Sequence, residues 1–279
     1  MFTALTIAGS DSSGGAGIQA DIKTMSALGV YAMSVITAVT AQNTTGVYGI
    51  QYTDDSMIEN QLQCVLSDIP PDAVKIGMLS SPASVEIIAG YLSDYNIRNI
   101  VIDPVMVSTS GDSLTKNDTV RALEKYLLPA AAVITPNIPE AEILSGHKIL
   151  TQDSFIDAAR ELSEKYNTAV LIKGGHAVFN DTLTTLLNEG KDNKLIEYST
   201  DILVCPDSDP LYLEAKRTDN PNTHGTGCTL SSAIASYLAR GLRLEDSVRL
   251  AKNYVTGAIN AKLNLGKGRG PLNHLYNLK

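Results

Sequence analysis

Residues 222–238 read NTHGTGCTLSSAIASYL, a glycine-rich turn that runs directly into a helical pattern. Glycines let the backbone turn tightly without a side chain in the way. The first turn of a helix carries N–H groups with no partner inside the helix, and the helix dipole adds positive potential there. The pattern therefore predicts a site for a phosphoryl group, although an ordinary loop entering a buried helix is the alternative. The catalytic candidates are Gly225, Thr226, Gly227 and Cys228.

Apolar runs alternate with helical patterns on both sides of this turn. We expect strands at 5–8, 35–39, 46–51, 73–76, 100–103, 131–135 and 169–173, and a β pair at 183–187 and 195–198. We expect helices at 18–28, 57–66, 82–95, 118–128, 139–144 and 154–166, then after 227 and after 244, with a surface excursion at 201–222. Continuously apolar central strands are typical of a parallel sheet covered on both faces, so an α/β fold is predicted. No linker divides residues 1–279, which favours a single domain.

Composition excludes several classes of protein. The chain has 279 residues, a net charge of −8 and a pI of about 5.0, which disfavours nucleic acid as a partner. Three widely spaced cysteines do not suggest a disulfide framework or a zinc site. No segment is apolar enough to span a membrane, and the N-terminus lacks the pattern of a signal peptide. We therefore expect a cytoplasmic protein without a membrane partner.

Polar residues follow the predicted strands, at the edge where parallel sheets bind ligands. Asp103 is a candidate metal ligand or phosphate neighbour, with a turn cap as the alternative. Asn137 and Glu140 match a capping box, and the free edge of the Glu140 carboxylate is a second candidate metal ligand. Lys173 is a candidate to neutralise a polyphosphate, with a solvated strand end as the alternative.

A second group of residues contains the candidates for substrate binding. Gln42 ends an apolar strand, and its amide offers donors and an acceptor, as the edge of an aminopyrimidine also does. A structural bond to a neighbouring loop is the alternative role for Gln42. Asp21 is a further polar candidate, and Met78 and Val107 are candidate apolar walls.

Two familiar nucleotide motifs are weak or absent. Residues 15–20 match the dinucleotide fingerprint G-x-G-x-x-G/A, but the preceding predicted strand ends too early and no acidic residue closes the next one. No G-x-x-x-x-G-K-[ST] segment is present, which excludes a P-loop kinase by pattern. His176 and His224 lack metal-ligand spacing, so no metal is assigned to them.

Taken together, ordered motifs along nearly the whole chain resemble the hydroxymethylpyrimidine/phosphomethylpyrimidine kinases of the ribokinase-like superfamily. They are TIAGSDSSGGAGIQAD at 6–21, AQNT at 41–44, KIGML at 75–79, DPVMV at 103–107, TPN at 135–137, KGGH at 173–176 and NTHGTGCTLS at 222–231. The segment 201–219 departs from the family, which usually has a shorter β segment there. Because this segment leads to the nucleotide side, adenine contacts are not carried over.

The resemblance implies a three-layer α/β/α sandwich, a homodimer and the cofactors ATP and Mg²⁺. It implies phosphorylation of 4-amino-5-hydroxymethyl-2-methylpyrimidine and then of its monophosphate, in thiamine biosynthesis. Gln42 would bind the pyrimidine, Lys173, Asn137 and Thr226 the nucleotide, and Asp103 and Glu140 the metal. A pyridoxal or pyridoxine kinase and a non-catalytic pyrimidine sensor are the competing hypotheses.

Cys228 takes the position where most of the superfamily carries a catalytic aspartate. We expect it to accept the proton of the substrate hydroxyl. A helix start lowers a thiol pKa, whereas an approaching phosphate opposes ionisation, so the sequence leaves the net pKa open.

Overall fold

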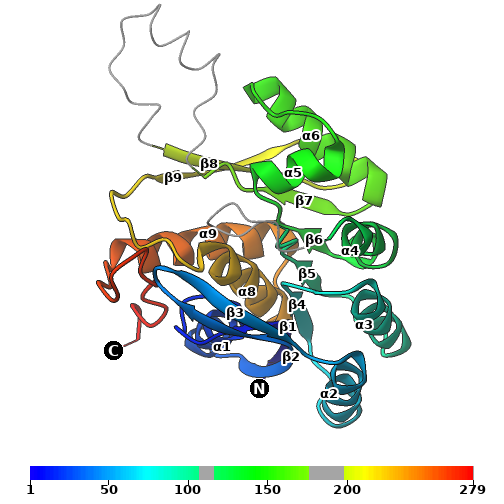
Figure 1. Cartoon of the computed structure of the whole chain (residues 1–279). Coiled ribbons are helices and arrows are strands. Elements are labelled where there is room, and N and C mark those ends of the chain that lie inside the picture. Colours follow the sequence, from blue (N-terminus) through cyan, green and yellow to red (C-terminus); the bar gives the residue numbers. More distant parts are fainter. Residues whose placement is uncertain (107–115, 176–197, 279) are drawn as a thin grey trace, which may run out of the picture.

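A computed structural model describes residues 1–106, 116–175 and 198–278, which form a central sheet between two layers of helices (Figure 1). The strands are β1 (Thr3–Asp11), β2 (Tyr31–Asn43), β3 (Gly46–Tyr52), β4 (Ala73–Ile76), β5 (Ile100–Ile102), β6 (Val133–Ile134), β7 (Ala169–Ile172), β8 (Tyr198–Val204) and β9 (Leu211–Lys216). The main helices are α1 (Gly17–Ala27), α2 (Asp55–Asp68), α3 (Pro82–Asp94), α4 (Asn117–Ala122), α5 (Ile138–Ser145), α6 (Gln152–Tyr166), α8 (Thr226–Ala239) and α9 (Leu244–Asn260).

The nine described strands are ordered β3-β2-β1-β4-β5-β6-β7-β8-β9. The six strands from β2 to β7 in this order are parallel, while β3, β8 and β9 pair antiparallel at the two edges. The predicted mostly parallel sheet and three-layer architecture are therefore confirmed. All the parallel strands end on the same side, so the residues that follow them meet along one edge.

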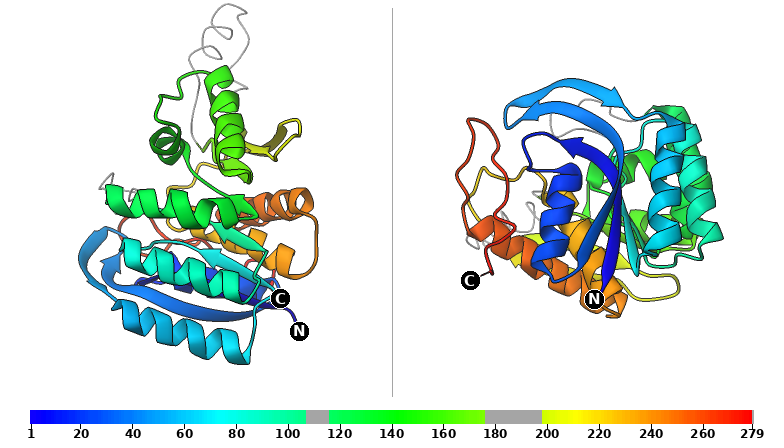
Figure 2. Two further views of the ribbon diagram at one scale, coloured as in Figure 1. Left: turned by 90° about the vertical axis from the view of Figure 1, so that its right-hand side faces the viewer. Right: turned by 90° about the horizontal axis from the view of Figure 1, so that it is seen from below.

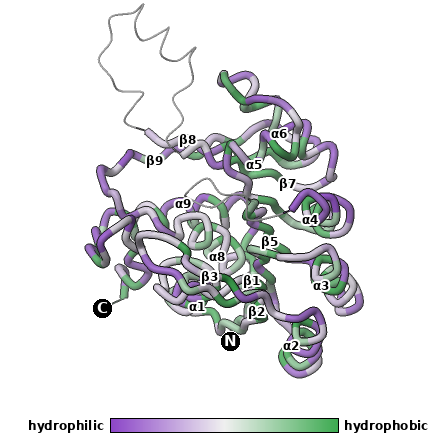
Figure 3. Tube along the Cα trace, in the orientation of Figure 1, coloured by the Kyte–Doolittle hydropathy of each residue, from purple (hydrophilic) through white to green (hydrophobic). Residues whose placement is uncertain are grey.

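Helices cover both faces of the sheet, as seen from below, where α1 lies on one side of β1 and α2 and α3 on the other (Figure 2, right). One apolar cluster joins α1, α8 and α9 to their face through residues such as Met25, Ile234 and Val248. The other cluster joins α2, α3 and α6 to the opposite face through residues such as Leu62 and Ile88. The apolar strands between the layers stand out in the hydropathy view (Figure 3). Burial on both faces explains the continuous apolar runs in the sequence.

The segment after residue 200 differs from the prediction of a surface excursion. It forms most of β8 and all of β9, and Ile202 and Leu203 are almost completely buried. The expectation of an excursion rests on three prolines, Pro206, Pro210 and Pro221. The first two lie in the connection between the strands and the third follows β9, so none of them removes a ladder hydrogen bond. The predicted β pair at 183–187 and 195–198 lies outside the described residues, except for Tyr198 at the start of β8.

The predicted helix at 118–128 is the second difference. Residues Asn117–Ala122 are α-helical, but Leu123–Leu127 continue as a π-helix and Leu128–Ala130 as a 3-10 turn. Pro129 lacks the N–H that would continue the α-helical pattern, so the last turns adjust around it. Within the described ranges, no helix is long and apolar enough to cross a bilayer.

Candidate active site

The N-terminus of α8 is built so closely against the loop before α1 that only glycine fits there. Gly225 caps α8 with φ +83°, in the left-handed region. A Cβ at Gly225 would lie 1.8 Å from the carbonyl oxygen of Gly15. The hydroxyl of Thr226 donates to the carbonyl of Thr223 at 2.6 Å and tightens the turn. Residues 225–228 are hereafter called the phosphate cradle. They begin α8 and, because Gly225 and Gly227 have no side chains, they leave main-chain N–H groups available to an anion.

An ion pair lies directly against this cradle. Lys173, after β7, donates to Asp103 Oδ1 at 2.7 Å, and Thr135 donates to the same oxygen at 3.1 Å. A Cβ at Gly227 would lie 3.1 Å from Asp103 Oδ2 and 3.4 Å from Lys173 Nζ. Lys173 and Asp103, two predicted ligand residues, thus meet Gly227, which lies 54 and 124 positions further along the chain.

The capping box at the start of α5 is confirmed. Asn137 accepts from the Glu140 N–H at 2.9 Å, and the Glu140 carboxylate accepts from the Asn137 N–H at 2.9 Å. The second carboxylate oxygen of Glu140 accepts a long hydrogen bond of 3.4 Å from the Met106 N–H. This oxygen keeps a lone pair that a metal ion could use, so Glu140 as a metal ligand stays a prediction. Burial, opposed by Lys173 and aided by the nearby Asp103, raises the pKa of Glu140 to about 7.

Cys228 lies between the first turns of α1 and α8, with the Gly17 N–H bonded to its sulfur. The residue as a whole is partly buried. Loss of water around it raises the pKa of Cys228 to about 11, although the positive Lys75 opposes that rise. The lowering expected from a helix start is therefore outweighed by desolvation.

Asp21 lies beneath the site and is fully buried. It binds the ammonium of Lys75 at 2.8 and 3.0 Å and the hydroxyl of Thr6 at 2.6 Å, and Ser232 also donates to it. Burial alone would lower the pKa of Lys75, but Asp21 and then Cys228 hold it above its usual value. Asp21 therefore pairs with Lys75 inside the protein and has no exposed surface with which to bind a substrate, contrary to the prediction.

Gln42 lies beside the cradle, at the end of β2. Its amide contacts His224 Nε2 at 3.4 Å and the hydroxyl of Thr40 at 3.2 Å. His224 Nε2 also lies 2.8 Å from Asp11 Oδ2. Burial would raise the pKa of Asp11, but hydrogen bonds, led by the one from His224, hold it at about 2. The predicted proximity of Gln42 and the 225–228 turn is therefore confirmed.

Of the two residues predicted as apolar walls, Met78 and Val107, the structure describes only Met78. Met78 follows β4, and its terminal methyl lies against Gly9, where a Cβ would be 2.9 Å away. Its carbonyl accepts from Thr37 at 2.8 Å, which fixes the backbone there. Val107 lies outside the described residues.

Besides the Asp11–His224 contact, sequence reasoning missed the buried pairs Asp21–Lys75 and Asp201–Lys252. Lys75 is the one charged residue in β4, and such a charge inside an apolar strand is a usable signal. Asp201 in β8 binds the Gly174 N–H at 3.0 Å and Lys252 at 2.7 Å, and so fixes the backbone after Lys173. No spacing in the sequence connects Asp201 with Lys252, because they meet only through the fold.

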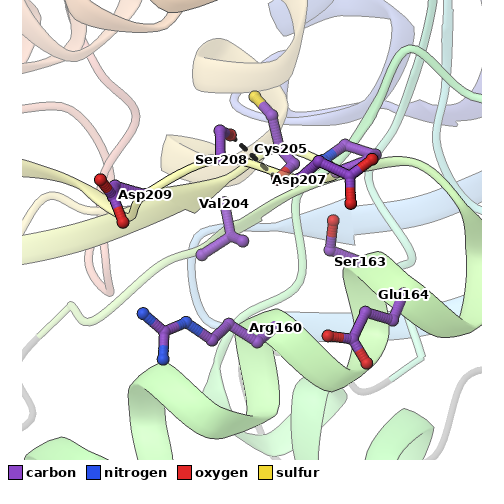
Figure 4. Close-up of a pocket in the computed structure, with 9 residues that line it drawn as sticks. Arg160, Ser163, Glu164, Val204, Cys205, Asp207, Ser208 and Asp209 are labelled. Carbon is purple, nitrogen blue, oxygen red and sulfur yellow. Dashed lines mark hydrogen bonds between the residues drawn. The ribbon is translucent and has the colours of Figure 1, made fainter.

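A separate surface pocket of about 300 Å³ lies between α6 and the end of β8 (Figure 4). Arg160, Glu164 and Asp207 are among its lining residues. Val204 in its wall pairs with Val170 at the start of β7, whereas Lys173 follows the end of that strand. The pocket therefore opens at the other end of the sheet and is not part of the site described above.

The fold and the site together define a class of protein. A glycine-lined helix start, an Asp–Lys ion pair against it and a polar glutamine beside it fit the site of a phosphotransferase. The chain matches the phosphomethylpyrimidine kinase family over residues 11–273, and it belongs to that family.

Curated relatives agree with this assignment. The chain is 43% identical to hydroxymethylpyrimidine/phosphomethylpyrimidine kinase of Haemophilus influenzae, covering 97% of this chain and 95% of the relative. It is 44% identical to the thiamine biosynthesis bifunctional protein ThiED of Geobacter sulfurreducens, covering 97% of this chain but only 52% of that protein. The chain is thus a phosphotransferase similar to kinases of thiamine biosynthesis.

Solved structures show two neighbouring activities. The phosphomethylpyrimidine kinase of Clostridium difficile is 46% identical, with a TM-score of 0.76 over 93% of this chain and 100% of that one. The ADP complex of pyridoxal kinase from Staphylococcus aureus is 33% identical, with a TM-score of 0.86 over 100% of this chain and 95% of that one. The ribokinase-like fold is therefore shared with pyridoxal kinases, while sequence similarity is higher to the pyrimidine enzyme.

Proposed function

We propose that this protein transfers the γ-phosphoryl group of ATP to 4-amino-5-hydroxymethyl-2-methylpyrimidine, and then to the resulting monophosphate. The observation that carries the proposal is the placement of Gln42 beside His224, which directly precedes the phosphate cradle. A heterocycle bound by Gln42 thus has the cradle within reach of its hydroxymethyl group. The identities to pyrimidine kinases support this substrate class over the alternatives.

In this mechanism the cradle amides hold the phosphoryl group as negative charge spreads over its oxygens. Donors fixed before the reaction stabilise such charge by roughly 3–4 kcal/mol each. Lys173 adds a positive charge against the same turn, and its ion pair with Asp103 keeps the ammonium in place. Cys228 would accept the proton of the substrate hydroxyl, and Thr226 and Asn137 would complete the nucleotide contacts.

The residues near Lys173 suit Mg²⁺. Asp103 and Glu140 are carboxylates, and Mg²⁺ is usually held by one or two carboxylates together with substrate phosphates and water. Consistent with that mode, the described part of the chain has no cluster of three or more His, Cys, Asp or Glu able to bind a metal alone. When bound, Mg²⁺ would neutralise the β- and γ-phosphate oxygens.

A homodimer through the β2–β3 hairpin is the second part of the proposal. β3 is an edge strand, and Tyr48 is 72% exposed, with Val47, Ile50 and Tyr52 also exposed. An uncovered apolar edge strand favours pairing with another chain. Gln42 lies near the end of β2, where the chain turns into β3. A second copy that covers this hairpin would therefore also hold the backbone of Gln42 in place. Light scattering should give a dimer mass that falls to the monomer value for the double variant Tyr48→Lys, Ile50→Lys; a monomeric parent protein would contradict this interface.

Pyridoxal kinase is the second candidate function because several pyridoxal kinases share the fold with TM-scores of 0.83 to 0.86. A coupled assay of ADP release, run with the pyrimidine alcohol and with pyridoxal, separates the candidates. The proposal expects much higher kcat/KM with the pyrimidine. Preference for pyridoxal would favour the second candidate, and no turnover with either would favour a sensor.

A further inference from the structure

The orientation of the Gln42 amide follows from the hydrogen atoms that its neighbours carry. Asp11 is almost completely buried and, with a pKa of about 2, stays ionised, so its oxygens only accept. His224 Nε2 lies 2.8 Å from Asp11 Oδ2 and must therefore carry a hydrogen, whatever the charge of the ring. An amide nitrogen 3.4 Å from that Nε2 would bring two donors together. The carbonyl oxygen of Gln42 therefore belongs at this point, where it shares with Asp11 the one hydrogen on Nε2. The two ends of the amide can be exchanged because they have the same shape.

The other end of the amide agrees with this orientation. Thr40 Oγ1 donates its single hydrogen to the Ser10 carbonyl at 2.9 Å. Its lone pairs then face the second end of the Gln42 amide at 3.2 Å. An amide nitrogen at that end donates to Thr40 without competition, whereas a carbonyl there would compete with Ser10 for one hydrogen. Both contacts thus select the same arrangement.

We propose that the Asp11–His224 pair turns the Gln42 amide oxygen toward the phosphate cradle and its nitrogen toward Thr40, and that this order decides which way round the substrate ring binds. His224 and Asp11 are then positioning residues, because they act on the substrate through Gln42. The inference rests on the proposed function and extends it to substrate orientation.

The chemistry of the ring shows why the order matters. In 4-amino-5-hydroxymethyl-2-methylpyrimidine a ring nitrogen that accepts, an amine that donates and the hydroxymethyl group follow one another along one edge. The amine must meet the Gln42 oxygen on the His224 side, and the ring nitrogen must meet the amide nitrogen on the Thr40 side. The hydroxymethyl group, next to the amine, then points past His224 toward residues 225–228. The opposite amide orientation would direct it away from the cradle.

The structure holds His224 firmly in this position. The backbone N–H of His224 donates to the carbonyl of Gly270 at 3.2 Å. Its ring packs against Gly15, where a Cβ would lie 2.4 Å from His224 Cδ2. Asp11 is held in turn by the N–H groups of Gly15 and Ala16 at 3.1 and 2.8 Å. Substituting Gly15 therefore displaces the ring without removing any polar group of the pair.

The first test needs no substrate. In ligand-free protein labelled with ¹⁵N-histidine, NMR should show His224 with a protonated Nε2, assigned by the loss of its signal in His224→Gln. An unprotonated Nε2 would overturn the proposal. This result stands whether or not the protein is a pyrimidine kinase.

The second test measures discrimination between two ligands by calorimetry. The 4-oxo analogue of the pyrimidine alcohol reverses the pattern, since its ring N–H donates and its carbonyl accepts. Wild-type protein should prefer the 4-amino compound by about 100-fold or more in Kd. His224→Asn, which has no donor at the Nε2 position, should reduce this ratio about tenfold because the amide can rotate. His224→Gln, which keeps a donor there, should retain the ratio within about threefold.

Gly15→Ala should reduce the ratio as His224→Asn does, with Gly90→Ala as the control because no atom lies within 4 Å of a Cβ at Gly90. An unchanged ratio in His224→Asn and Gly15→Ala, with melting temperatures close to wild type, would overturn the proposal. If wild-type protein does not bind the 4-amino compound at all, the proposed function fails, and the NMR result alone decides whether the pair sets the amide.

Discussion

Lys75 Nζ lies 2.8 and 3.0 Å from the two carboxylate oxygens of Asp21, and neither side chain has any exposed surface. The pair ties β4 to α1 directly beneath Cys228, whose sulfur is bonded by the first N–H of α1. Because Ser232 on α8 also donates to Asp21, the same carboxylate joins both helices that meet at the thiol. The pair therefore supports the geometry of the phosphate cradle from below.

Removing one member of this pair should destabilise the fold. We predict that Lys75→Met lowers the free energy of unfolding by about 3–5 kcal/mol, because an unpaired Asp21 charge stays buried. The control is Lys148→Met, which removes an exposed pair with Glu142 and should cost at most about 1 kcal/mol. Urea denaturation measures both values, and equal losses in the two variants would contradict the role of the buried pair.

The second prediction concerns the contact between the cradle and the Asp103–Lys173 pair. Gly227→Ala should lower kcat by about tenfold or more, because the new methyl displaces the Asp103 carboxylate, and with it the ion pair to Lys173, by a few tenths of an ångström. Circular dichroism should show an intact fold. Steady-state kinetics on Gly227→Ala and the control Gly90→Ala test this, and a kcat equal to that of wild type would show that the contact does not matter for turnover.

Cys228 gives a prediction about pH. Since the pKa of the thiol is raised to about 11, the thiolate fraction and hence kcat should rise from pH 7 to pH 9. Cys228→Ser should lower kcat by about 100-fold or more and remove the rise, while pyrimidine affinity stays close to that of wild type. A rate–pH profile of both proteins tests this, and unchanged turnover in the serine variant would remove Cys228 from the role of base.

Glu140 makes stability depend on pH in the metal-free protein. Its pKa is raised to about 7 in the folded state from an ordinary value of 4.5, so folding favours the protonated form. This contribution is complete below about pH 4.5 and is lost as pH rises through 7. We predict that the melting temperature falls between pH 5 and 8 in wild type but not in Glu140→Gln.

If Asp103 and Glu140 bind Mg²⁺, they do so as carboxylates, so Mg²⁺ should stabilise wild-type protein more at pH 8 than at pH 6. Differential scanning calorimetry with and without Mg²⁺ measures the difference. Equal Mg²⁺ stabilisation at both pH values would argue against Glu140 as a ligand.

The sequence was sufficient to predict the parallel core because strands buried on both faces leave apolar runs, as in β4 and β5. It was also sufficient for the glycine turn and the capping box, which depend on neighbouring residues. It was misleading at 201–222, where prolines outside the ladder concealed β8 and β9. The Asp11–His224 and Asp21–Lys75 pairs depend on contacts across 213 and 54 positions, which local pattern does not encode.

The central claim is that one site seats the pyrimidine on Gln42 and the transferred phosphoryl group on residues 225–228. A crystal structure with the pyrimidine alcohol and a non-hydrolysable ATP analogue tests it most directly. We predict the ring at Gln42 and the γ-phosphate at the amides of Gly227 and Cys228, with the substrate hydroxyl between that phosphate and the Cys228 sulfur. A ring bound away from Gln42, or a γ-phosphate away from residues 225–228, would contradict the claim.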